Sequence, residues 1–368
     1  MKLTFRWYGD EDPVKLEYIR QIPGMKGIVS AIYDIPVGET WPLEAIWSLK
    51  EKIHKAGLEL SVIESVPVHE DIKLGLPTRD QYISNYQQTL RNLAEAGVQT
   101  VCYNFMPVFD WTRSALNFRL EDQSTTLIYD HDVVQAMNPL KGELKLPGWD
   151  TSYEDETLSE LVNQYGQISE EHLWQHLDYF IQAIIPVAED VGVKMAIHPD
   201  DPPWSIFGLP RIITNRENLE RFLRLYDSPY NGLCFCTGSL GASKENDIPA
   251  MLRHFGGVGR VNFVHARNVK ITGDKSFREV AHLSEEGSID MYEVMNALYE
   301  FGFDGPLRPD HGRMIWGETG RPGYGLYDRA LGAVYLNGLY EGIAKSYREP
   351  SVQHKYNAMV GNERGQER

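Results

Sequence analysis

The sequence predicts an α/β fold in which eight parallel strands and their helices form a single (β/α)8 TIM barrel. Short runs rich in β-branched and aromatic residues recur eight times along the 368 residues, and helical patterns lie between them. The runs are apolar nearly throughout, as expected for parallel strands that are covered on both faces. No G-x-G-x-x-G motif follows the first run, so a doubly wound open sheet is the weaker alternative.

The predicted strands occupy, in chain order, residues 3–8, 27–32, 58–64, 99–105, 194–198, 232–236, 260–265 and 305–310. Gly57, Gly97 and Gly192 each stand between a helical pattern and the next strand. A residue in the left-handed conformation commonly ends a helix at such a point.

Three helices carry recognisable start signals. Ser169 precedes two glutamates, which place negative charge at the positive end of a helix. Thr78 and Thr214 are each followed three residues later by Gln or Glu, which is the spacing of a capping box. We therefore expect helices to begin directly after these three residues.

One long interruption follows the fourth predicted strand. Residues 107–166 contain no clear strand, but they include Trp111 and Arg113. A long βα loop lies on the C-terminal face of a barrel, so this insertion is expected to form a lid or substrate wall, or a contact between subunits. The barrel is predicted to be one catalytic domain, 1–345, followed by a polar tail, 346–368.

The charge balance excludes several classes of partner. There are 36 Lys and Arg against 52 Asp and Glu, for a net charge of −16. Nucleic-acid binding needs positive charge, and so does attraction to anionic lipid. The sequence has neither a signal-peptide pattern nor an apolar stretch of membrane-spanning length. Its three cysteines are too few for a disulfide scaffold, so we expect reduced thiols and a cytoplasmic location.

Four potential metal ligands stand at the ends of four consecutive predicted strands. They are His198, Cys236, His265 and Asp310, at the fifth to eighth strands. A lone histidine, cysteine or aspartate at such a point is usually structural, but four on adjacent strands favour a metal site at the catalytic rim. Cys234 shares strand parity with Cys236 and lies one layer deeper, which indicates core packing.

The identity of the metal is left open by these ligands. A closed tetrahedral zinc site fits the ligand count, but it would be structural. An ion that accepts five or six ligands leaves positions for substrate, which favours Mn²⁺ or Fe²⁺. A thiolate among the ligands argues against Mg²⁺.

Residues suited to catalysis and substrate binding surround the predicted metal ligands. His311 directly follows Asp310, and Tyr324 stands between two glycines that allow its ring to project; both are candidates for proton transfer. Tyr327 is instead expected in the first turn of the last helix. Candidate substrate-binding residues are Asn104, Arg267 and Arg313, the arginines because a guanidinium can bind a carboxylate through two hydrogen bonds.

Several of these segments resemble the mannonate dehydratase family. The matching motifs are KLTFRWYG, YNFMPVFDWTR, KMAIHPDDPPW, FCTGSLG, FVHARN, RPDHGR and GRPGYGLYDRALG, which together span nearly the whole chain. The resemblance implies a xylose-isomerase-like barrel that requires Mn²⁺ or Fe²⁺. It implies conversion of D-mannonate to 2-keto-3-deoxy-D-gluconate with loss of water, in hexuronate catabolism.

The resemblance also implies roles for individual residues. The metal ligands would be the four strand-end residues His198, Cys236, His265 and Asp310, and the acid–base pair would be His311 and Tyr324. The expected partners are a sugar-acid substrate and a second copy of the chain in a homodimer. Two alternatives remain: another metal-dependent sugar or sugar-acid isomerase or epimerase on the same barrel, and a metal-bound scaffold without activity.

Overall fold

Eight parallel strands close into a barrel in the computed structural model, which describes residues 1–137 and 155–348. Around the barrel the strands follow the order β1-β12-β9-β8-β7-β4-β3-β2. Each overlaps one predicted strand, so the predicted TIM barrel is confirmed. Their bounds are β1 (Lys2–Arg6), β2 (Gly27–Ser30), β3 (Glu59–Glu64), β4 (Thr100–Tyr103), β7 (Lys194–Ile197), β8 (Asn231–Cys236), β9 (Val261–Ala266) and β12 (Pro306–Pro309).

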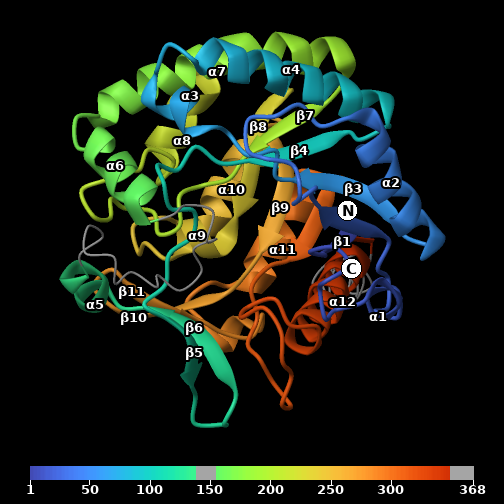
Figure 1. The fold of residues 1–368 in the computed structure, drawn as a ribbon. Coiled ribbons are helices and arrows are strands. Elements are labelled where there is room, and N and C mark those ends of the chain that lie inside the picture. The colour runs from blue at the N-terminus through green and yellow to red at the C-terminus, as the bar shows by residue number, and fades with distance from the viewer. Residues whose placement is uncertain (138–154, 349–368) are drawn as a thin grey trace, which may run out of the picture.

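Helices surround this ring of strands (Figure 1). None of those in the described ranges is long and apolar enough to cross a membrane. A 3₁₀ turn, Ser284–Glu286, precedes α11. The helices are α1 (Leu16–Arg20), α2 (Leu43–Lys55), α3 (Glu70–Leu74), α4 (Arg79–Glu95), α5 (His131–Ala136), α6 (Asp155–Tyr165), α7 (Glu170–Val191), α8 (Arg216–Leu225), α9 (Thr237–Gly241), α10 (Ile248–Gly257), α11 (Met291–Glu300) and α12 (Tyr327–Arg348).

The predicted helix ends are confirmed in part. Ser169 caps α7 through a capping box, and Gly192 ends the same helix with φ of 73°. The helix α4 begins directly after Thr78, as predicted, but the Thr78 side chain makes no capping hydrogen bond, so the expected capping box is not formed. At α8 the cap is Asn215, one residue after Thr214, because the Asn215 side chain accepts from the third backbone N–H of the helix.

A second, antiparallel sheet lies beside the barrel, near α5 in Figure 1. We call it the accessory sheet; its order is β10-β11-β6-β5. Two of its strands fall within 107–166, so the expectation of no strand there was wrong. They are short, and β6 pairs with a strand that follows it by nearly 150 residues, which local patterns cannot reveal. The bounds are β5 (Ala115–Arg119), β6 (Thr125–Tyr129), β10 (Val269–Gly273) and β11 (Ser276–Glu279).

The accessory sheet joins loops that leave the C-terminal ends of three barrel strands. β5 and β6 follow β4, β10 and β11 follow β9, and Thr125 bridges to Met314 in the loop after β12. The insertion therefore lies on the predicted face. Residues 138–154 of the insertion and 349–368 of the predicted tail are outside the described ranges, and α12 continues past 345 to Arg348.

One layer of the barrel interior has its own small apolar cluster. The three cysteines are all free and buried. Cys102 and Cys234 belong to this layer, which agrees with the core packing predicted for Cys234. Their thiols and a ring nitrogen of His265 also lie within 4.8 Å of one another, a spacing that one metal ion could bridge. The members of the cluster are Val29, Val62, Cys102, Ala196, Cys234 and Phe263.

Candidate active site

The four predicted metal ligands meet at the C-terminal rim of the barrel. Cys236 ends β8 and is paired with His265 on β9, while His198 and Asp310 directly follow β7 and β12. Since these four strands are neighbours in the barrel, their ends bring the side chains together. Cys236 also caps α9, and its Sγ lies 3.1 Å from Ser239 Oγ.

The spacing of these side chains is compatible with one shared cation. Ligand atoms of His198, Cys236 and His265 lie within 4.8 Å of one another. Asp310 Oδ2 lies 3.7 Å from Cys236 Sγ and 3.9 Å from His265 Nδ1. His265 is fully buried, and its Nε2 makes no well-formed hydrogen bond among the described residues, although Glu64 Oε2 lies 3.3 Å away. A buried, poorly satisfied imidazole beside a thiol and a carboxylate fits a metal-binding role.

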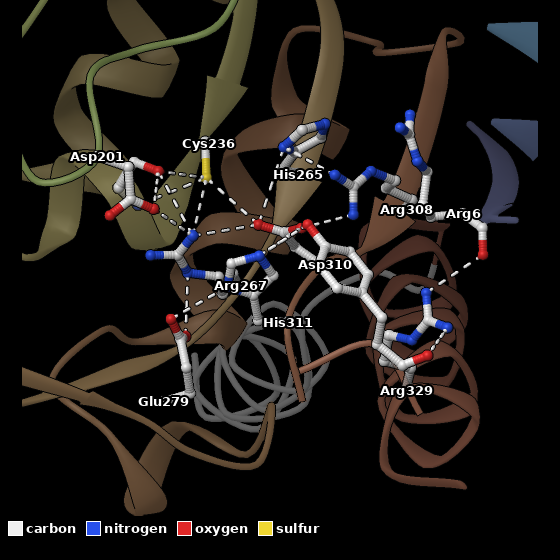
Figure 2. A network of polar contacts seen from close by, with 12 residues as sticks. Arg6, Asp201, Cys236, His265, Arg267, Glu279, Arg308, Asp310, His311 and Arg329 are labelled. Carbon is white, nitrogen blue, oxygen red and sulfur yellow. Dashed lines mark hydrogen bonds and ion pairs between the residues drawn. The ribbon is translucent and has the colours of Figure 1, made fainter. Parts of the chain in front are cut away.

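Asp310 is held in its ionised form by arginines. Its Oδ1 accepts a hydrogen bond of 2.5 Å from Arg308 Nη1, and its Oδ2 lies 3.3 Å from Arg267 Nη1 (Figure 2). Burial raises the pKa of the Asp310 carboxyl, but Arg308 and the other neighbouring cations hold that pKa well below its usual range. The other two nitrogens of the Arg308 fork bind Glu64 at 2.9 and 3.1 Å. The carboxylate is thus available as a ligand at neutral pH.

His311 and Tyr324 form a buried hydrogen-bonded pair. His311 Nε2 lies 2.8 Å from Tyr324 Oη, and the rings meet edge to face. Gly323 has φ of 79°, a conformation that favours glycine and directs the following tyrosine inward. Burial, followed by the neighbouring Tyr8, raises the pKa of the Tyr324 phenol well above its ordinary value. Tyr324 therefore keeps its proton at neutral pH. Tyr327 begins α12 as predicted.

A buried network of arginines and carboxylates adjoins this pair. Arg267 lies between Asp201, at 2.8 Å, and Glu279, at 3.1 Å (Figure 2). Arg113 binds Asp201 through both terminal nitrogens, at 2.8 and 3.1 Å, and Glu279 at 2.7 Å. Burial raises the pKa of both carboxyls, but Arg113 and Arg267 more than offset this, so both pKa values are lowered. These four side chains are joined in what we call the ion-pair network: Arg113, Asp201, Arg267 and Glu279.

The three predicted substrate-binding residues all have protein partners. Arg267 is fully buried within the ion-pair network. Arg313 donates to Asp328 at 3.0 Å and to Asp122 at 3.1 Å. Asn104 donates to Asp110 at 2.8 Å, within the loop that follows β4. Of the contacts described for these three residues, only those of Arg267 reach predicted metal ligands.

Several residues of the site were missed by the sequence interpretation. Arg308 precedes Asp310 by two positions and so shares its face of the strand, a signal that was present in the sequence. Asp201 follows His198 within one motif, so the sequence also contained a signal for this residue. Glu279 had no such signal, because β11 reaches the site only through the accessory sheet. The centroid of the Trp111 ring lies 5.0 Å from that of His311, so Trp111 forms part of the wall of this site.

Comparisons with known proteins agree with this site. The family model for D-mannonate dehydratase (UxuA) matches residues 1–350. Mannonate dehydratase 2 of Halalkalibacterium halodurans is 68% identical over 344 residues, which cover 94% of this chain and 100% of that protein. The crystal structure of mannonate dehydratase from Streptococcus suis serotype 2 is 54% identical, with a TM-score of 0.89, and covers 94% of this chain and 96% of its own.

A more distant likeness concerns the barrel alone. The xylose isomerase domain protein of Planctomyces limnophilus has a TM-score of 0.52 at 15% identity, covering 93% of this chain and 98% of its own. At that identity only the fold is shared, so the isomerase or epimerase alternative gains no support. The match of the family model to nearly the whole chain, together with the close relatives, shows that this protein belongs to the D-mannonate dehydratase family of hydro-lyases.

Proposed function

We propose that the protein dehydrates D-mannonate to 2-keto-3-deoxy-D-gluconate and water, a step of hexuronate catabolism. The observation that carries this proposal is the position of a proton-transfer pair beside a candidate metal centre. His311 Nε2 lies 2.8 Å from Tyr324 Oη and 3.9 Å from Asp310 Oδ1. Dehydration next to a carboxylate needs a base, an acid and nearby positive charge. His311 and Tyr324 would supply the first two, and a cation held by the neighbouring ligands would supply the third.

The residues proposed to hold the metal are His198, Cys236, His265 and Asp310. Their mixture of imidazole, thiolate and carboxylate suits Mn²⁺ or Fe²⁺, which leave coordination positions for a substrate. When bound, such a cation supplies Lewis-acid stabilisation of the negative charge that develops as the C2 proton is lost. Arg308 keeps the Asp310 carboxylate oriented toward the other ligands.

His311 and Tyr324 are proposed to divide the two proton transfers. His311 Nε2 accepts the proton from C2, and the Tyr324 phenol, which retains its proton, gives it to the hydroxide leaving C3. The resulting enol converts to the 2-keto acid. Since Nε2 and Oη lie 2.8 Å apart, the proton gained by His311 can return directly to Tyr324 and restore both residues.

The substrate carboxylate requires a local cation, because a protein of net charge −16 does not attract anions over a long range. Arg267 Nη2 is buried and has no hydrogen-bond partner in the described ranges, so we propose it for this contact. Arg313 and Asn104 are proposed for the outer part of the substrate. Each would exchange a present partner, Asp328 or Asp110, for a substrate oxygen.

We further propose a cytoplasmic homodimer. A reducing compartment keeps the Cys236 thiol available as a ligand. Trp316, 73% exposed, and Leu331, 49% exposed, leave apolar surface at and just before α12 that a second copy would cover. Light scattering of the purified protein at micromolar concentration tests this, and a monomeric mass would contradict it.

The proposed reaction is tested by incubating the metal-loaded enzyme with D-mannonate and a panel of other hexonates, and assaying the 2-keto-3-deoxy acid. We expect product from D-mannonate, loss of activity with a chelator, and recovery when Mn²⁺ or Fe²⁺ is added. An isomer or epimer in place of the 2-keto-3-deoxy acid would contradict dehydration. Normal turnover by protein of verified zero metal content would contradict the metal requirement.

A further inference from the structure

The accessory sheet reaches the proton-transfer pair through one side chain, Glu279. This residue ends β11, and its Oε1 lies 3.2 Å from Nδ1 of His311. The opposite ring nitrogen of His311 faces Tyr324 at 2.8 Å. Glu279 and His311 are both almost fully buried, so solvent does not compete for these contacts.

The chemistry of this contact determines which nitrogen of His311 carries hydrogen. An ionised carboxylate accepts hydrogen bonds and cannot donate them, so Nδ1 must be the protonated nitrogen of His311. In the neutral imidazole, Nε2 is then left with its lone pair, directed at Tyr324. The opposite tautomer would set a lone pair of Nδ1 against the carboxylate and leave Nε2 unable to accept a proton.

Glu279 is itself held in place from three sides. Arg113 Nη2 donates to Oε1 at 2.7 Å, and Arg267 Nε forms an ion pair with Oε2 at 3.1 Å. Thr126 Oγ1, on β6, donates to the backbone carbonyl of Glu279 at 2.9 Å. Because the arginines engage both carboxylate oxygens, they hold the side chain in one position against the His311 ring, whereas Thr126 supports only the main chain of β11.

We propose that Glu279 is a positioning residue that fixes the Nδ1–H tautomer and the ring orientation of His311. The inference rests on the proposed function, in which His311 is the base. It also gives the accessory sheet a specific role in the site, because the hairpin after β9 delivers the carboxylate and the insertion after β4 delivers the Arg113 that holds it.

The test begins with the Glu279→Gln variant, whose amide can present either a donor or an acceptor to Nδ1 and so no longer specifies the tautomer. We expect kcat for D-mannonate dehydration to fall about 10–100-fold, with KM within about 3-fold and full metal content. Glu279→Asp keeps the charge that the arginines require but withdraws the carboxylate by one methylene. Its kcat should also fall, and it provides the test if the Glu279→Gln variant does not fold.

A double-mutant comparison separates positioning from a general structural effect. If Glu279 acts through His311, adding Glu279→Gln to a His311→Asn enzyme should change kcat by less than about 3-fold. Thr126→Val is the matched control, because it removes a support of β11 and leaves the carboxylate in place. This control should keep kcat within about 3-fold of wild type while lowering the unfolding midpoint.

Three results would overturn the inference: wild-type kcat in both Glu279 variants, an equal further loss in the His311→Asn background, or an equal loss in Thr126→Val. A wild-type enzyme that forms no 2-keto-3-deoxy acid would overturn the proposed function and this inference with it. Active wild type with unaffected Glu279 variants would overturn the positioning role alone.

Discussion

The two halves of the candidate site are built in different ways. The donors of the metal half stand at the ends of β7, β8, β9 and β12, where strand register alone brings them together. The proton-transfer half, His311 and Tyr324, lies on the loop after β12 and touches the accessory sheet through Glu279. The first half depends on the barrel, whereas the second depends on side chains from insertions.

This difference indicates how each half is kept rigid. Backbone hydrogen bonds between neighbouring strands hold the predicted metal ligands at a fixed spacing. A loop has no such ladder, so the ion-pair network of Arg113, Asp201, Arg267 and Glu279 serves in its place. Variants in one half should therefore leave the other intact, and four predictions test this.

Removing the thiol should have the largest effect. Cys236→Ser is expected to lose the bound metal and at least about 10³-fold of kcat/KM, because a neutral hydroxyl is a far poorer ligand than a thiolate. Metal analysis and steady-state kinetics measure both. Cys234→Ala is the matched control, which should lose stability but retain metal. Full metal occupancy in Cys236→Ser would show that the thiol is not a ligand.

Disrupting the ion-pair network should lower stability, in addition to loosening the contact of Glu279 with His311. Arg113→Met leaves two buried carboxylates short of a partner, and we expect the free energy of unfolding to fall by about 3–5 kcal/mol. Arg221 also binds a carboxylate through two hydrogen bonds, both to Glu171 at 2.8 Å, but on the surface. Arg221→Met should therefore cost about 1 kcal/mol or less in urea unfolding. Equal losses would show that the network adds no more stability than a surface pair.

Removing a single hydroxyl should affect the proton-transfer half alone. Tyr324→Phe is expected to lower kcat about 10²-fold at full metal content, since the phenol is the proposed acid. Tyr327→Phe, at a partly exposed position three residues later, should retain wild-type kcat. Loss of metal from Tyr324→Phe would indicate that the two halves are not independent.

Lowering the pH should weaken the ion-pair network gradually, whereas the Arg113 substitution removes one of its members outright. The pKa values of Asp201 and Glu279 are lowered in the folded protein, so their contribution to stability is present above the unfolded values near pH 4. It is lost as the pH falls below about 4, at about 1 kcal/mol per carboxylate between pH 4 and 3. Urea unfolding at several pH values measures the slope, which should be shallower in Arg113→Met. An unchanged slope in that variant would contradict the assigned cause.

The sequence was sufficient for the barrel and for the meeting of the six predicted catalytic and metal-binding residues. Parallel strands end at one rim, so residues such as His198 and Cys236 could be placed together without coordinates. The sequence did not reveal Glu279, because its contact with His311 depends on pairing between β6 and β11. Arg267, predicted to bind substrate, is also surrounded by carboxylates that no linear pattern associates with it.

The long separation between the two parts of the accessory sheet has a consequence for folding kinetics. Arg113 and Glu279 are 166 residues apart, and closing so long a loop carries a large entropic cost before any contact forms. The four metal ligands follow one another along the chain at intervals of 29 to 45 residues, so their strands can join one after another through shorter loops. During refolding we therefore expect metal binding to recover first and turnover later, with a stage in which the protein holds its ion but its histidine is not yet aligned.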